Sequence, residues 1–177
     1  MLKYFMHKII YFLLLQSVLF TMLNAKEPTL VLLDSVLSNG IQKFTLGNYN
    51  FYSQVYGVLT LESLYENASL NENCKKSLKT FYKKNPMLEH FSSHILKVTQ
   101  MYHIDFKNAY SVLYVRGEKT LAELLLEKGL AVVKPLFNDD EFIYTYNKAQ
   151  LSAKVSKKGI WQESTIIQCV NALYKEK

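Results

Sequence analysis

Arginine is nearly absent from this sequence. Of its 21 Lys and Arg residues, one is an arginine, Arg116. A guanidinium group binds a phosphate through two parallel hydrogen bonds, and lysine does not reproduce that geometry. A site that clamps a phosphate between two arginines therefore cannot form within one subunit, whatever the fold. The formal net charge of +6 is mild, so it neither requires nor excludes a polyanionic partner.

Cysteine is scarce as well, with Cys74 and Cys169 as the two residues of this type. Neither has the closely spaced companion that zinc sites require. Two interpretations remain: a pair of buried thiols, or a disulfide that closes a long loop between the middle and the end of the chain. We expect the disulfide, because the N-terminal pattern described next indicates an oxidising compartment.

One long apolar run is present, and it lies near the N-terminus. Residues 9–20 are apolar apart from two positions, two lysines precede them, and the small residue Ala25 ends the segment. This pattern is typical of a signal peptide. We predict that residues 1–25 are removed before Lys26, which leaves a periplasmic or secreted protein with a formal charge of 19 − 15 = +4. The alternative is an uncleaved anchor helix, for which the run is close to the lower length limit.

The middle of the chain predicts strands followed by a helix. Short apolar runs alternate with turn residues such as Asn39-Gly40 and Gly47-Asn48, which favours a three-stranded meander. A basic segment then predicts a helix that ends before Asn85-Pro86. The expected strands are residues 29–37, 41–46, 50–59, 94–99 and 109–115, and the expected helix is residues 72–84.

The C-terminal part predicts two helices that flank a short strand. Leucines recur at helical spacing from Leu121, and Lys128-Gly129 ends that helix with a cation and a left-handed residue. Residues 130–133 form the strand. Acidic and amide residues at 138–141 suit the start of the second helix. The expected core residues of that helix are Phe142, Tyr146, Ala149 and Ala153.

Three segments of this part together resemble the staphylococcal nuclease (thermonuclease-like) family. They are LLLEKGLAVV at residues 124–133, AQLSAK at 149–154 and GIW at 159–161. The resemblance implies a β-barrel plus helices: a five-stranded OB-fold barrel with about three helices. It also implies one thermonuclease-like domain over residues 26–162, which leaves residues 163–177 as a C-terminal tail.

The resemblance assigns candidate site residues. Active members carry the segment R-L-x-G-I-D-x-P-E at the end of the third strand, and residues 54–62 of this chain read QVYGVLTLE. Gly57 and Glu62 match, which makes Glu62 the candidate catalytic base. Gln54 stands in the arginine position, and Leu59 stands in the position of the metal-binding aspartate.

Two further family positions are changed. An aspartate pair is expected after the first strand, and this chain offers Asp34 alone as a weak metal ligand, because Val36 takes the second place. The second catalytic arginine aligns with Asn108, beside Lys107, or with Ala109 if no gap is introduced. Calcium would be the cofactor if the chain had kept nuclease activity. Otherwise we expect no cofactor.

The remaining features favour binding over cleavage. Lys107, Asn108, Gln54 and Tyr56 are the candidate nucleic-acid-binding residues of the barrel, since lysines bind phosphates and aromatic rings stack on bases. A second basic surface is expected on the predicted helix. Its lysines are Lys75, Lys76, Lys79, Lys83 and Lys84. The alternative is that these lysines only solubilise a helix face.

Three functions remain open. We favour an exported, non-catalytic domain that binds a protein partner in the cell envelope, because the residues for phosphodiester cleavage are missing. The first alternative is a single-stranded nucleic-acid-binding protein. The second is a divergent calcium-dependent nuclease that hydrolyses phosphodiester bonds. Membrane contact is expected only through the N-terminal segment before cleavage.

Overall fold

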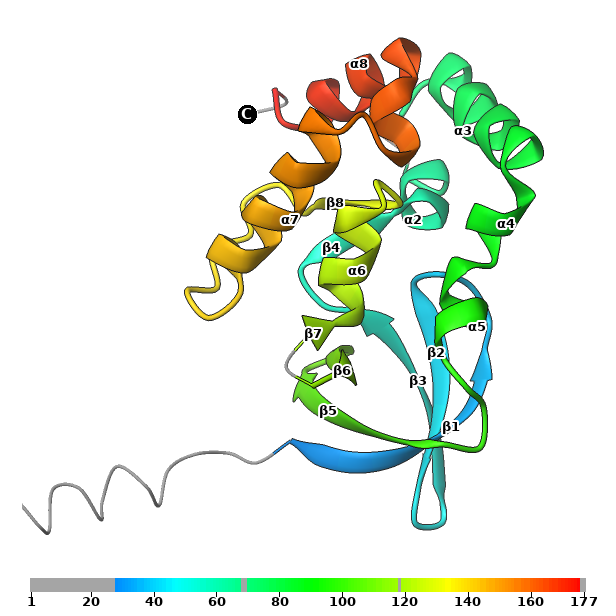
Figure 1. Ribbon diagram of the computed structural model, residues 1–177, viewed down its shortest axis with the longest axis vertical. Coiled ribbons are helices and arrows are strands. Elements are labelled where there is room, and N and C mark those ends of the chain that lie inside the picture. The colour runs from blue at the N-terminus through cyan, green and yellow to red at the C-terminus, as the bar shows by residue number, and fades with distance from the viewer. Residues whose placement is uncertain (1–27, 68–69, 118, 176–177) are drawn as a thin grey trace, which may run out of the picture.

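The computed structural model describes residues 28–67, 70–117 and 119–175 (Figure 1). The predicted signal peptide, residues 1–25, lies outside the described residues. Within them, no helix combines the length and apolar composition needed to cross a membrane. In Figure 1 the long strands form the lower half of the molecule, and most of the helices gather above them.

Five strands close into a barrel. They are β1 (Thr29–Val36), β2 (Ile41–Leu46), β3 (Tyr49–Val55), β5 (Met101–Lys107) and β6 (Tyr110–Arg116). The order is β3-β2-β1-β5-β6 with antiparallel neighbours, and a parallel pairing of β3 with β6 closes the barrel. At this closure Gln54 lies opposite Tyr110, and Val55 lies opposite Ser111. The predicted five-stranded barrel is confirmed.

Alternate residues of the strands fill the barrel interior, as the two-residue period of a strand requires. The fully or almost fully buried side chains include Val31, Leu33, Phe44, Ile104 and Leu113. One polar pair lies at the closing seam, where the hydroxyl oxygens of Ser53 and Ser111 are 2.8 Å apart. This hydrogen bond satisfies two buried hydroxyl groups that would otherwise destabilise the core.

The strand predicted at residues 50–59 is two strands in the structure. Gly57 adopts a φ of 75°, and the chain passes there from the barrel into β4 (Val58–Thr60). This strand pairs with β8 (Ala131–Val133) in a small antiparallel sheet. It leads into α2 (Leu61–Tyr65), whose N-cap Thr60 accepts a hydrogen bond from the Ser63 N–H. The turn at Gly57 therefore places Glu62 on a helix and not on the barrel wall.

After α2, three further helices precede the fourth barrel strand. Helix α3 (Glu72–Lys84) has the predicted bounds. The strand predicted at residues 94–99 is wrong. Helix α4 (Pro86–Glu89) is followed by α5 (Phe91–Ile95), which includes residues 94 and 95, and residues 96–99 form a bend and a turn. Pro86 suits the first turn of a helix, and buried Ser92 is hydrogen-bonded to Asn39. These contacts keep the chain helical, and β5 begins only afterwards.

The C-terminal part follows the predicted order. Its elements are β7 (Lys119–Thr120), α6 (Leu121–Glu127), β8, α7 (Ile143–Val155) and the 3-10 helix η1 (Gly159–Gln162). A capping box between Thr120 and Glu123 begins α6. Helix α7 begins after the acidic residues, because the Asp139 carbonyl accepts the Ile143 N–H in a preceding turn. The four predicted core residues are buried: Phe142, Tyr146, Ala149 and Ala153.

The segment predicted as a tail contains a packed helix. Helix α8 (Ser164–Leu173) buries Ile166, Cys169 and Val170. The expected disulfide joins Cys169 to Cys74 of α3, and the two helices lie side by side at the top of Figure 1. The described residues contain seven α-helices, four of them with seven or more residues, whereas the sequence predicted about three.

Candidate functional site

Three of the predicted site residues fall into two separate clusters. Glu62 lies in the first turn of α2, next to the turn between β1 and β2. Lys107 and Tyr56 lie together beneath the loop that precedes α7. Among the described residues, no hydrogen bond or ion pair joins Glu62 to Lys107. Each cluster therefore has its own chemistry.

The Glu62 carboxylate is held by its neighbours. Its Oε1 accepts hydrogen bonds from the Tyr82 hydroxyl at 3.1 Å and from the Asn39 backbone N–H at 3.4 Å. Its Oε2 is buried and has no hydrogen-bond partner in the described part of the chain. Burial and the charge of Glu62 raise the pKa of Tyr82, so the hydroxyl stays a donor at neutral pH. A general base needs an oxygen within reach of the proton that it removes; in Glu62, Oε2 is buried and Oε1 already accepts two hydrogen bonds.

Asn39, next to Glu62, forms hydrogen bonds to α4 and α5, the helices after α3. Its buried Nδ2 donates to the Leu88 carbonyl, and its Oδ1 accepts from the Ser92 backbone N–H, both at 2.9 Å. The Ser92 hydroxyl donates to the Asn39 carbonyl. The segment from α4 to α5 is thus bonded to the β1–β2 turn, beside Glu62. The Asn39 Nδ2 also donates to the Tyr82 hydroxyl at 3.3 Å. The sequence identified Asn39 only as a turn residue, because this contact joins residues far apart in the chain.

Lys107 lies at the centre of the second cluster, which is acidic. Its Nζ is 3.3 Å from Glu141 Oε2, 3.4 Å from Asp105 Oδ2 and 3.9 Å from Asp139 Oδ2. The Tyr56 hydroxyl donates to Asp139 Oδ2 at 2.9 Å. Asp105 is on the same strand as Lys107, and the other two carboxylates come from the loop before α7. The cluster therefore ties the barrel to the C-terminal helices.

The charge of Lys107 is compensated by these carboxylates. Burial lowers the pKa of Lys107, but the hydrogen bond and charge of Glu141, with the charges of Asp105 and Asp139, outweigh burial and raise the pKa above 10.5. Since the folded pKa exceeds the unfolded one, these contacts stabilise the fold below the unfolded pKa. Their contribution is lost as the pH rises through the folded pKa.

Replacing Lys107 with methionine should lower the free energy of unfolding by about 1 kcal/mol at neutral pH, because three carboxylates lose their shared cation. Urea unfolding measures this difference. The difference should shrink as the pH rises through the raised pKa of Lys107, because the side chain then loses its proton. The control is Lys148→Met, since exposed Lys148 has no ion pair among the described residues. A difference that stays constant with pH would contradict the assignment.

The other predicted residues join neither cluster. Gln54 is exposed on β3, and Asn108 is exposed in the β5–β6 turn with a φ of 59°. Asp34 lies within β1, where its carboxylate pairs with Lys43 on the outside of the barrel. The turn after β1 is formed by later residues, so Asp34 does not stand where the resemblance expected the family aspartates.

These positions do not fit a calcium ion. Calcium binds six to eight oxygen atoms, whereas Asp34 is paired with Lys43, Leu59 offers no oxygen from its side chain, and Glu62 is engaged by Tyr82. In the described ranges, no three His, Cys, Asp or Glu side chains are placed to hold a metal.

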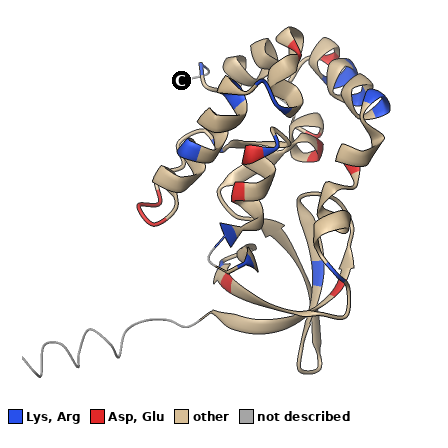
Figure 2. Ribbon diagram, in the orientation of Figure 1, with Lys and Arg blue, Asp and Glu red and all other residues tan. Residues whose placement is uncertain are grey.

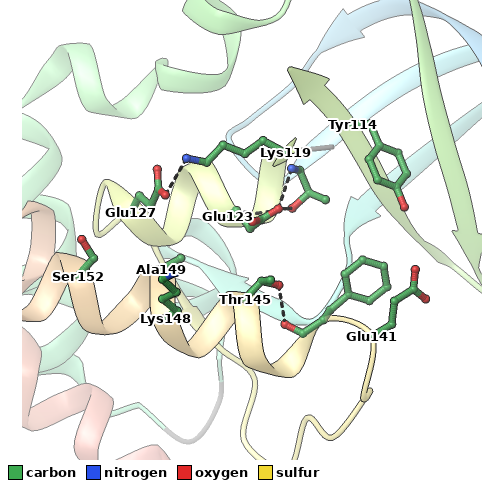
Figure 3. A pocket seen from close by; sticks show the side chains of 11 residues that line it. Tyr114, Lys119, Glu123, Glu127, Glu141, Thr145, Lys148, Ala149 and Ser152 are labelled. Carbon is green, nitrogen blue, oxygen red and sulfur yellow. Dashed lines mark hydrogen bonds and ion pairs between the residues drawn. The ribbon is translucent and has the colours of Figure 1, made fainter. Parts of the chain in front are cut away.

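A hollow of about 690 Å³ lies between α6 and α7, near Glu141 (Figure 3). Of the five charged residues that line it, all but Lys148 have structural partners in the described part of the chain. Lys119 Nζ is 2.7 Å from Glu127 Oε1, and Glu123 completes the capping box of α6. The capping box stabilises the start of α6 and the ion pair involves its last residue, so few charged groups are left to bind a ligand.

The tyrosines of the barrel do not form one aromatic groove. Tyr102 is buried, and its hydroxyl accepts a hydrogen bond from the Lys97 backbone. The Tyr110 ring is covered by Lys134, whose Nζ is 3.6 Å from the ring centre. Tyr49 and Tyr52 are well exposed, and both lie on β3 near its hairpin with β2. The rings that Lys107 does contact are those of Tyr56 and Phe142.

The closed mixed barrel with helices packed at one end defines an OB-type nuclease fold. A family model described as Staphylococcal nuclease homologue matches residues 69–163, which is more than half of the chain. The chain belongs to the staphylococcal nuclease homologue family. No curated protein showed a significant match to it. Residues 54–62 lie outside the matched range, so the family assignment depends on the later strands and helices.

Proposed function

We propose that this chain is a non-catalytic member of its family that acts by binding a partner outside the cytoplasm. The observation that carries the proposal is the compensation of Lys107 by Asp105, Asp139 and Glu141. Phosphoryl chemistry needs positive charge aimed at the phosphate. One lysine among three carboxylates leaves a negative cluster, which repels a phosphate.

The remaining catalytic positions support the same proposal. Gln54 and Leu59 replace an arginine and a metal-binding aspartate of the family, and the Glu62 carboxylate is held by Tyr82 and Asn39. Removing one electrostatic donor from an active site typically lowers the rate about 10²- to 10³-fold. The loss of several such groups together should leave no measurable cleavage.

Two features support a location outside the cytoplasm. The disulfide between Cys74 and Cys169 is a feature of oxidising compartments, since cytosolic thiols are kept reduced. The apolar N-terminal pattern of residues 1–25 is typical of exported proteins. The periplasmic or secreted location therefore forms part of the proposal.

The partner that we propose is a protein of the envelope. Exposed apolar and aromatic side chains lie on the outside of the barrel, on strands β1, β2, β3 and β5. They are Leu30, Leu46, Tyr49, Tyr52 and Met101. Exposed aromatic residues are enriched in protein interfaces. The barrel wall is thus the proposed contact surface.

Incubation of the purified protein with labelled single-stranded DNA and calcium should leave the DNA intact on a denaturing gel. Glu62→Gln should give the same result, because Glu62 has no cation or guanidinium partner for catalysis. An active nuclease incubated in parallel with the same labelled DNA shows that the assay detects cleavage. Calcium-stimulated digestion that Glu62→Gln abolishes would reject the proposal and establish a divergent nuclease.

A further inference from the structure

Strand β3 leaves one of its two edges open. On one side it pairs with β2 from Tyr49 to Gln54. On the other side it pairs with β6 only at Gln54 and Val55, because β6 begins at Tyr110. In the described part of the chain, no strand therefore pairs with the outer edge of residues 49–53. This end of the β2–β3 hairpin extends beyond the barrel at the bottom of Figure 1.

The hydrogen bonds at the end of β3 show which backbone groups face the open edge. The Val55 N–H donates toward the turn before β2, and the Tyr56 N–H donates toward β6. The N–H and C=O groups of successive residues in a strand point to opposite sides. Odd-numbered residues of β3 therefore bond to β2, and the N–H and C=O groups of Asn50 and Tyr52 face outward, where a further strand can bind.

This edge lacks the usual protection against pairing. Natural proteins guard an edge strand with charged side chains, proline, a bulge or a covering segment. Residues 44–61 contain no charged residue and no proline, although 20% of the whole chain is charged. Strand β3 is accordingly tan along its length in Figure 2. Tyr49 and Tyr52 are 79% and 63% exposed, so outward-facing backbone groups lie beside exposed aromatic rings with no charge among them.

We propose that a second copy of this chain pairs with this edge, so that the two barrel sheets join across a two-fold axis. Strand β3 of one copy lies antiparallel to β3 of the second copy, with Phe51 at the axis. Asn50 then lies opposite Tyr52 of the second copy, and these two residues exchange N–H···O=C hydrogen bonds. The same pair forms twice, because a two-fold interface uses the same residues on both copies.

The direction of the backbone groups selects this register. A hydrogen-bonded pair in an antiparallel ladder needs outward-facing groups on both strands. Asn50 and Tyr52 both face outward, so an axis at Phe51 matches donors with acceptors. An axis at Tyr52 would require the backbone groups of Gln54, which already lies in the pairing with β6. The axis at Phe51 therefore uses the whole open edge, residues 49–53, and disturbs no bond of the barrel.

Two features favour a second copy over an unrelated protein or a nucleic acid. Edge pairing needs an unguarded edge on the partner as well; most soluble proteins guard theirs, whereas a second copy brings this same open edge. The chain also has a formal net charge of +6, so two copies repel each other over most of their surface and meet best at an uncharged strip. The inference goes beyond the proposed function: Tyr49 and Tyr52 contact the second copy, and Leu30 and Met101 of the barrel wall remain for the envelope protein.

Sedimentation velocity of the purified protein tests the pairing. Between about 1 and 300 µM, the range of weak association, the sedimentation coefficient should rise from that of a monomer to that of a dimer. High salt should not weaken the dimer, because no charge lies at the edge. Asn50→Pro should weaken dimerisation at least about tenfold, because each dimer loses two backbone hydrogen bonds. Proline is tolerated on an edge strand where its missing N–H would face outward, so this variant should stay folded.

A second variant adds the charge that the edge lacks. Tyr52→Glu should weaken dimerisation about tenfold or more, because a charge on an edge strand opposes pairing. The new carboxylate would lie opposite Lys43 of β2, a favourable cross-strand pair, so the monomer should remain stable. The matched control is Tyr144→Glu, at a tyrosine that is 73% exposed on α7, which should dimerise like the wild type. Circular dichroism shows whether each variant is folded.

Amide hydrogen exchange locates the interface within the dimer. The amides of Asn50 and Tyr52 should exchange at least about tenfold more slowly at high protein concentration, because they become hydrogen-bonded. A dimer in which these two amides are unchanged, a protein that stays monomeric throughout, or an Asn50→Pro dimer as tight as that of the wild type would each overturn the inference. These outcomes leave the proposed function intact, since the DNA digestion tests it separately.

Discussion

Gly159→Ala should lower the free energy of unfolding by about 3–5 kcal/mol, or prevent accumulation of folded protein. Gly159 has a φ of 55°, and a Cβ at this position would lie 2.3 Å from the Gly129 carbonyl oxygen and 2.4 Å from that of Lys128. The contact is reciprocal, since a Cβ on Gly129 would lie 2.2 Å from the Lys158 oxygen. Both obstacles are backbone atoms, which cannot rotate away as a side chain would.

The matched control is Gly47→Ala. Gly47 has a φ of 57°, and a Cβ there would meet nothing within 4 Å. This variant introduces only the strain of a left-handed backbone conformation, and it should lower the free energy of unfolding by about 1–2 kcal/mol. Urea unfolding of both variants measures the comparison. Similar losses at the two glycines would show that the close approach of the two chain segments contributes nothing beyond the strained φ.

Removing the disulfide should have the second largest effect. The bond joins residues separated by 95 positions. A cross-link that closes a loop of about 100 residues lowers the conformational entropy of the unfolded chain, which is expected to raise the free energy of unfolding by up to about 4.7 kcal/mol. The double variant Cys74→Ala/Cys169→Ala should therefore lose about 3–4 kcal/mol and melt about 10 °C lower. Alanine at both sites avoids leaving one reactive thiol.

Reductant provides the control for the disulfide. Wild type in dithiothreitol should match the double variant, and the double variant should not respond to dithiothreitol. Since α8 also contacts the rest of the fold through the Tyr174 hydroxyl and the Val133 carbonyl, it should remain attached until unfolding. A double variant as stable as oxidised wild type would show that packing alone holds α8 in place.

The C-terminal part was predictable because its signals are local. Leucine spacing and the Lys128-Gly129 ending locate α6, and the pattern from Phe142 to Ala153 locates the buried face of α7. The family resemblance depends on the same residues. The structure adds the physical reason for two of them: Gly129 and Gly159 are glycines because their backbones touch, and the Ile160 N–H donates to the Gly129 carbonyl.

The region between the third and fourth barrel strands was harder to predict. The short run at residues 94–99 has the composition of a strand, but Ser92 and Asn39 bond the preceding segment into helices. Residues 50–59 also do not form one strand, because the chain turns at Gly57 and passes from the barrel sheet into the small sheet with β8. In both places a contact distant in sequence outweighed the local preference of the residues.

The sequence by itself determined that no pair of guanidinium groups can hold a phosphate in one subunit, because composition does not depend on the fold. It also determined the order of the C-terminal elements through local periodicity. Only the tertiary structure decided the state of the remaining charges. Folding brings distant segments together, so that Lys107 forms ion pairs with Asp139 and Glu141, and Glu62 accepts a hydrogen bond from Tyr82. Whether a charge is free or compensated depends on such neighbours, and no local pattern specifies them.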